Sequence, residues 1–226
     1  MGASRRNTVE EVRAKCYRCY RPVSSCMCPH VRPIETRTKF VILMHPKEFK
    51  KIKNGTGHLT HLSLPNSELY IDIDFTHHKA VNALIEDANN LCFVLYPGDE
   101  SHDLNRERID AGSRQIVIFI IDSTWVCSVK MLRLSRNLQA LPKLSFTHSR
   151  RSAFQIKEQP AAYCLSTIES TLTVLELLNE HKTESIDQEA FERFLDPFKA
   201  MIQYQIGCIA DSRSSHINAV RFKKRG

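Results

Sequence analysis

Four cysteines lie close together near the start of the chain, at Cys16, Cys19, Cys26 and Cys28. Their spacing is C-x2-C-x6-C-x-C, so a short loop can bring two close pairs together around one ion. Four thiolates at the corners of a tetrahedron are a typical ligand set for structural zinc. The usual iron–sulfur spacings do not match, and a thioredoxin-like redox pair would stand at a helix start. The pattern therefore predicts a zinc-binding segment over residues 1–36, with iron–sulfur and redox chemistry as the alternatives.

Disulfide bonds are not the default expectation for these cysteines. The first residues have no apolar core of the kind that a secretory signal needs. The longest strongly apolar run, at residues 116–121, is far shorter than the ~20 residues of a membrane-spanning helix. We therefore expect a cytoplasmic protein without a membrane partner, in a compartment that keeps thiols reduced.

The chain is basic, with 32 lysines and arginines against 25 aspartates and glutamates, a net charge of +7. Such an excess attracts polyanions, and nucleic acid is the first of these to consider. Arg18 and Arg21 stand among the clustered cysteines. A bound ion would hold them on a rigid turn, so we expect both to contact phosphates.

Apolar runs alternate with helical patterns after the cysteine segment. The expected strands are 38–46, 68–75, 91–96 and 116–121. The expected helices include 76–90, capped by Thr76, and 161–181 and 187–207, the last interrupted by Pro197. This alternation is typical of an α/β protein with a mostly parallel sheet flanked by helices, here over residues 37–226 with a helical C-terminal part.

Ligands of open parallel sheets bind beyond the carboxyl ends of the strands. That rule indicates the loops at His45-Pro46, at Tyr96-Pro97-Gly98 and at Asp122 to Trp125. The residues from Asp122 to Thr124 favour a helix start, whose N–H groups attract polar ligands, although a helix cap alone explains them too. Trp125 is the one tryptophan of the chain, and it either stacks on a base or anchors the core.

Several familiar sites are absent from the sequence. It has no G-x-G-x-x-G and no G-x-x-x-x-G-K-[ST], so neither a Rossmann dinucleotide site nor a P-loop is indicated. The histidines lack H-E-x-x-H spacing, which argues against a catalytic metal. Gly55-Thr56-Gly57 could cradle phosphate, but a solvated loop is the preferred interpretation.

Five motifs, taken in order, resemble the DTW-domain family. They are CYRCYRP with CMCPHVRP, NGTG, LYPGDES, DSTW and LSTIES, and they span residues 16–170. Bacterial members are tRNA-uridine aminocarboxypropyltransferases. The resemblance implies transfer of the 3-amino-3-carboxypropyl group of S-adenosylmethionine to N3 of a tRNA uridine, with release of methylthioadenosine. It also implies a SPOUT-like fold, a class in which the chain can be knotted.

The resemblance carries functional roles over to particular residues. Asp122 matches the motif aspartate and becomes the candidate general base, or the group that holds the amino group of S-adenosylmethionine by charge. The expected catalytic residues are Asp122, Thr124 and Trp125. The expected donor-binding residues are Leu95, Tyr96, Pro97, Gly98, Asp122, Ser123, Leu165, Ser166, Thr167 and Glu169. The expected RNA-binding residues are Arg18, Arg21, Arg150, Arg151, Lys223, Lys224 and Arg225.

Two other functions stay open at this point. A SPOUT-like RNA methyltransferase would use the same donor but transfer its methyl group. A non-catalytic, zinc-dependent RNA-binding module would bind tRNA without the donor. The sequence leaves open whether the protein is a monomer or a homodimer.

Overall fold

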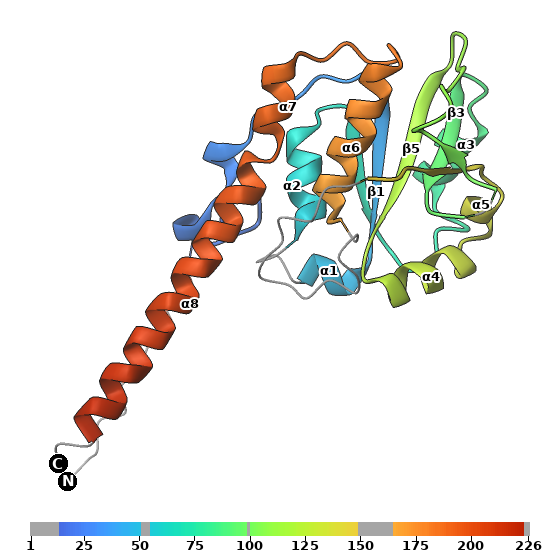
Figure 1. Cartoon of the computed structure of the whole chain (residues 1–226). Coiled ribbons are helices and arrows are strands. Elements are labelled where there is room, and N and C mark those ends of the chain that lie inside the picture. The colour runs from blue at the N-terminus through green and yellow to red at the C-terminus, as the bar shows by residue number, and fades with distance from the viewer. Residues whose placement is uncertain (1–13, 51–54, 99, 149–164, 224–226) are drawn as a thin grey trace.

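The computed structural model describes residues 14–50, 55–98, 100–148 and 165–223, with side chains up to Ala210 (Figure 1). Its centre is one six-stranded sheet with the strand order β2-β1-β5-β3-β6-β4. Every strand pair in it is parallel. The strands are β1 (Lys39–Met44), β2 (Ser67–Ile71), β3 (Asn90–Leu95), β4 (His102–Asp103), β5 (Gln115–Asp122) and β6 (Lys143–Ser145). The predicted α/β class with a mostly parallel sheet is confirmed.

The helices follow the strands along the chain and cover both faces of the sheet (Figure 1). The α-helices are α1 (Pro46–Lys50), α2 (Thr56–Ser63), α3 (Lys79–Glu86), α4 (Trp125–Leu134), α5 (Arg136–Gln139), α6 (Thr167–Glu180), α7 (Gln188–Phe194) and α8 (Asp196–Lys223). Two short 3-10 helices, Val23–Ser25 and Cys28–His30, lie in the cysteine segment. No helix of the described residues has both the length and the apolar character needed to cross a membrane.

The central strand β5 supplies apolar side chains to both faces of the sheet. Ile116, Ile118 and Ile120 belong to a core shared with α2, α6, α7 and α8. Val117 and Phe119 belong to a second core shared with α3, α4 and α5. Successive strand side chains point to opposite faces, and a strand covered on both faces therefore reads as a continuous apolar run.

Two predicted helix boundaries differ from the structure. Helix α3 begins at Lys79, and its N-cap is His78, whose side chain accepts a hydrogen bond from the backbone of Val81. Thr76 is not the cap, because its hydroxyl instead lies within hydrogen-bond distance of Asp74 Oδ1, at 2.6 Å, and of the carbonyl of Leu134 at the end of α4, at 3.0 Å. The predicted helix over 187–207 is divided, since α7 ends before Pro197, a residue that the first turn of a helix tolerates.

Helix α8 is the longest helix and projects from the body of the molecule (Figure 1). Its first turns are anchored, because Phe198, Met201 and Ile202 are buried in the core. The helix continues to Lys223. Intrahelical hydrogen bonds thus extend the element well past its packed portion.

Candidate functional site

Three neighbouring parallel strands, β1, β5 and β3, end at one edge of the sheet, the edge at which α1 and α4 begin (Figure 1). In the register between β1 and β5, Met44 lies opposite Asp122. The backbone N–H of His45 donates to the carbonyl of Asp122 over 3.0 Å. This bond ties the turn after β1 to the end of β5, so the backbone on both sides of Asp122 is held in place.

The carboxylate of Asp122 is the centre of this edge. Asp122 is buried, with 7% of its surface exposed. The hydroxyl of Thr167, the first residue of α6, donates to Oδ1 of Asp122 over 2.6 Å. At Gly57, in the first turn of α2, a Cβ atom would overlap this carboxylate. Three segments that are far apart in the sequence therefore meet at one carboxylate.

Gly57 and Thr56 are buried, which contradicts the interpretation of their segment as a solvated loop. The loop leads directly into α2, and the start of that helix packs against the end of β5. The sequence Gly55-Thr56-Gly57 indicated an unusual loop, but only the packing of α2 shows that Gly57 makes room for Asp122. The partial positive charge at a helix start also favours a nearby carboxylate.

The start of α6 is organised by its own side chains. Glu169 accepts two hydrogen bonds at Oε2 from Ser166, one from the backbone N–H at 2.9 Å and one from the hydroxyl at 2.6 Å. This arrangement is a capping box, which satisfies donors that the helix itself leaves unpaired. Glu169 is buried, so its structural contribution is to fix the helix start that carries Thr167. Its predicted donor-binding role stays a prediction.

Tyr96 and Trp125 form a stacked aromatic pair beside Asp122. Their ring centroids are 5.6 Å apart and the ring planes differ by 12°. Trp125 is 53% exposed, so the core-anchor alternative for this residue is wrong. Burial of the phenol raises the pKa of Tyr96 above its usual value. The pair thus presents a flat aromatic face to solvent at the ligand edge of the sheet.

The other predicted site residues surround this centre. Leu95 ends β3, and Pro97 and Gly98 follow in an exposed loop. Ser123 is half-buried, and its hydroxyl donates to the carbonyl of Thr124, the N-cap position of α4. Leu165 lies just before Ser166, also half-buried. The structure therefore places the predicted residues of the three motifs around one edge.

The predicted RNA contacts have different outcomes. Arg18 is exposed on the cysteine turn, as expected. Arg21 is 2% exposed and cannot serve as a surface contact, because its guanidinium is directed to Sδ of Met201 in α8 at 2.9 Å. Burial lowers the pKa of this guanidinium. Lys223 ends α8, whereas Arg150, Arg151, Lys224 and Arg225 lie outside the described residues.

The four clustered cysteines form a candidate metal centre. Their sulfur atoms all lie within 4.8 Å of one another, and the Cys16–Cys28 and Cys19–Cys26 pairs are both 3.7 Å apart. Zinc–sulfur bonds of about 2.3 Å at tetrahedral angles require sulfur atoms about 3.8 Å apart. Backbone N–H groups of Cys19 and Arg18 lower the pKa of the Cys16 thiol to about 6, which favours its thiolate, whereas burial raises the pKa of the Cys26 and Cys28 thiols. A bound cation would itself deprotonate the thiols that coordinate it. The donor set therefore fits a zinc ion.

The cysteine segment packs against the rest of the protein. Met27 and Ile34 are buried in the core that includes α8. Tyr20 adopts a left-handed conformation with φ 57°, and its ring lies 5.5 Å from that of His58 in α2. Phe49 completes the cluster, 5.4 Å from His58 between ring centroids. The division at residue 36 into two domains stays a prediction.

His58 is a buried, neutral histidine in this cluster. His58 is buried, and its Nε2 has no hydrogen-bond partner within the described part of the chain. Burial lowers its pKa to about 4, and the charges of His61 and Arg21 act in the same direction. A desolvated ring disfavours the charged form because the surrounding medium cannot stabilise it.

Comparison with known proteins adds to this geometry. The DTW domain matches residues 13–206. A protein of Mus musculus named tRNA-uridine aminocarboxypropyltransferase 2 is 29% identical over 87% of this chain and 65% of its own length. Proteins with the same name in Macaca fascicularis and Drosophila melanogaster are 28% and 27% identical, each over 86% of this chain and over 64% and 76% of their own lengths. The chain therefore spans less than two thirds of the mouse and macaque relatives, and no solved structure gives a significant match.

Replacement of Gly57 by alanine should disrupt the junction at Asp122. The added Cβ would overlap the carboxylate, and we expect the free energy of unfolding to fall by about 1–3 kcal/mol, as for other overpacked sites. Gly207→Ala is the matched control, because a Cβ there meets nothing within 4 Å and alanine favours a helix. Urea unfolding measures both variants, and equal stability of the two would contradict the assigned contact.

Removal of one metal ligand should weaken the cysteine segment. We expect Cys16→Ser to lose bound zinc and to melt at a lower temperature, because metal binding and ordering of such a segment are coupled. Cys208→Ser, at an exposed position of α8, should change neither quantity. Zinc content by mass spectrometry and thermal melting are the measurements. Unchanged zinc content in Cys16→Ser would refute the metal centre.

The neutral state of His58 predicts a pH dependence of stability. Between the unfolded pKa of 6.5 and the folded pKa of about 4, the unfolded chain binds a proton that the native protein does not. Stability should therefore be full above pH 6.5 and fall as pH is lowered through this window, by on the order of 1–2 kcal/mol for this group. His58→Phe should lose that part of the dependence, whereas His77→Gln, at an exposed site, should retain it. Urea unfolding at pH 7.5 and 4.5 tests this, and parallel losses in all three proteins would contradict it.

Proposed function

This chain belongs to the DTW domain family, and we propose that it transfers the 3-amino-3-carboxypropyl group of S-adenosylmethionine to N3 of a uridine in tRNA. Methylthioadenosine is the second product. The proposal is supported by the names of the three relatives and by their similarity over most of this chain. The structural observation that carries it is the convergence of Gly57 and Thr167 on the carboxylate of Asp122.

The reaction requires removal of the proton on N3 of uridine. This nitrogen is protonated at neutral pH and attacks carbon only after it loses the proton. Asp122 is the carboxylate at the meeting point of the motifs, and the hydroxyl of Thr167 orients it. In one role it accepts the N3 proton as a general base. In the other it holds the positively charged amino group of the donor, and the experiment below separates the two roles.

The reaction also needs the donor to be oriented. The propyl carbon must face the nucleophile while the methyl group faces away, a choice that binding geometry makes. Tyr96 and Trp125 offer a flat aromatic face on which a base, either the adenine of the donor or the target uridine, can stack. The exposed loop at Pro97 and Gly98 and the start of α4 border that face. These positions support the predicted donor site.

The finer assignments follow the family. A SPOUT-like topology, in a class that can be knotted, is supported by the all-parallel order of the strands. Zinc as the structural ion is supported by the sulfur geometry of the four cysteines. We propose a cytoplasmic enzyme with tRNA as its substrate and with the cysteine turn, through Arg18, as one tRNA contact. Monomer and homodimer both fit this proposal.

Mass spectrometry of unmodified tRNA incubated with the protein and S-adenosylmethionine tests the reaction. We expect addition of an aminocarboxypropyl group and formation of methylthioadenosine. A methyl group with S-adenosylhomocysteine would instead indicate an RNA methyltransferase. Binding of tRNA with neither product would leave the non-catalytic RNA-binding module.

The variant Asp122→Asn tests the role of the carboxylate. Its amide oxygen can still accept the hydrogen bond from Thr167, so the fold should persist. If Asp122 is the general base, we expect kcat to fall about 10²–10⁴-fold with KM for the donor little changed. If it holds the amino group, KM for the donor should rise instead. Asp187→Asn is the matched control, because asparagine caps a helix as well as aspartate does. Unchanged kcat and KM in Asp122→Asn would exclude both roles.

A further inference from the structure

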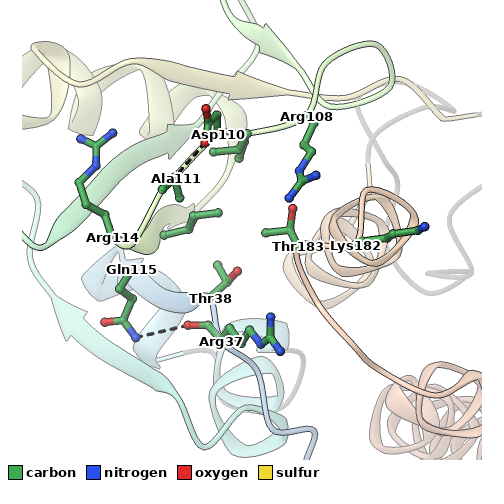
Figure 2. A pocket seen from close by; sticks show the side chains of 12 residues that line it. Arg37, Thr38, Arg108, Asp110, Ala111, Arg114, Gln115, Lys182 and Thr183 are labelled. Carbon is green, nitrogen blue, oxygen red and sulfur yellow. Dashed lines mark hydrogen bonds between the residues drawn. The ribbon is translucent and has the colours of Figure 1, made fainter.

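A cavity of about 240 Å³ lies at the opposite edge of the sheet, where β1 and β5 begin (Figure 2). Arg37 and Thr38 line it from the segment that enters β1. Residues 108–112 and 114–116 line it from the connection into β5, and Lys182 and Thr183 line it from the turn after α6. The cavity is therefore built by three segments that are distant in the sequence, and it is separate from the site at Asp122.

The cavity gathers positive charge that has no counter-ion. Its lining includes four cations, Arg37, Arg108, Arg114 and Lys182. All four are exposed, and none of them forms an ion pair with a described residue. Figure 2 shows the guanidinium of Arg108 directed towards Thr183, while Arg114 and Lys182 lie on opposite sides with their charged ends turned outward. By contrast, Lys39, Arg106, Arg193 and Lys199 are all paired with acidic side chains.

The acidic groups near the cavity are already engaged. Asp110 lines the wall, and its Oδ1 accepts a hydrogen bond from the backbone of Gly112 at 3.2 Å. Glu184 is buried and accepts from the backbone N–H groups of Arg37 and Thr38 at 3.0 and 2.7 Å. Four cations against these two carboxylates leave an excess of two positive charges, so the cavity as a whole favours an anion.

Two threonine hydroxyls in the lining are uncommitted. Thr38 is 1% exposed, and neither its hydroxyl nor that of Thr183 has a hydrogen-bond partner among the described residues. Lys182, next to Thr183, adopts the left-handed conformation with φ 60°, which is uncommon for residues other than glycine. Buried hydroxyls normally find a partner, so these two are candidate donors to an acceptor oxygen at the cavity wall.

We propose that this cavity binds a backbone phosphate of the RNA substrate. Phosphate oxygens accept hydrogen bonds from both guanidinium and hydroxyl groups, and such contacts position an RNA without reading its sequence. Among the described residues that line the cavity none is aromatic, so they offer no ring on which a base could stack. A phosphate group matches this chemistry.

The location suits a positioning role. From Gln115 to Asp122, strand β5 extends about 23 Å at ~3.3 Å per residue, so the cavity lies far from the reacting atoms. A folded tRNA is longer than this distance and can contact both edges of the sheet. The identity of the RNA as tRNA rests on the proposed function. The cations of the cavity would then orient tRNA while the opposite edge carries out the transfer.

The test compares two double variants with equal charge change. Arg37→Gln with Arg108→Gln removes two cations of the cavity and leaves the backbone bonds of residue 37 intact. Lys79→Gln with Arg136→Gln removes two exposed cations elsewhere. The dissociation constant for unmodified tRNA is measured over a range of salt concentrations, without S-adenosylmethionine. We expect the cavity variant to bind about tenfold more weakly and its salt slope to fall by about 1, with less than a twofold change in the control.

Three outcomes would overturn the inference. In the first, the cavity variant binds tRNA as tightly as the wild type, and in the second, both double variants lose affinity equally. In the third, the cavity variant still binds tRNA but no longer binds inorganic phosphate, as measured by calorimetry. The last result would make the cavity a site for a free anion. Because binding is measured without the donor, the result does not depend on the transfer reaction. Wild-type protein that forms no product, together with a selective affinity loss in the cavity variant, would refute the proposed function and support the RNA contact.

Discussion

The burial of one carboxylate constrains the arrangement of the whole candidate active site. A buried charge is tolerated only when hydrogen bonds and dipoles compensate it. Asp122 receives a hydrogen bond from Thr167 at the start of α6, and Gly57 lets the start of α2 approach it. The capping box of Glu169 in turn fixes the start of α6. This candidate site is therefore assembled by helix starts that meet at the end of β5.

The cysteine segment solves a different physical problem. It contributes few apolar side chains, chiefly Met27 and Ile34, to the common core. Four converging thiols allow an ion to order it where apolar burial is limited. Arg21 and the ring of Tyr20 then join the segment to α8 and to His58 of α2. Through these contacts the cysteine segment packs against α2 and α8.

The two edges of the sheet have contrasting chemistry. The carboxyl edge combines a buried carboxylate with an aromatic face at Tyr96 and Trp125. The amino edge combines hydroxyl groups with cations, among them Arg37 and Arg108, that form no ion pair with a described residue. Parallel strands impose this separation, because all their carboxyl ends lie together and all their amino ends lie together. We propose that the first edge holds the reacting base and the second edge an RNA phosphate.

The sequence by itself determined four of the six strands, the α/β class and four candidate metal-ligating cysteines, because continuous apolar runs and cysteine spacing are local patterns. It did not indicate β4 and β6, which are two and three residues long and too short to form an apolar run. It also indicated Asp122 through a motif at a strand end. Only the tertiary structure decided that Arg21 is buried against α8, that Trp125 stacks on Tyr96, and that Gly57 adjoins Asp122. These relations join residues far apart in the chain, and no local periodicity encodes them. The basic cavity belongs to the same class, since its cations come from three segments that only folding brings together.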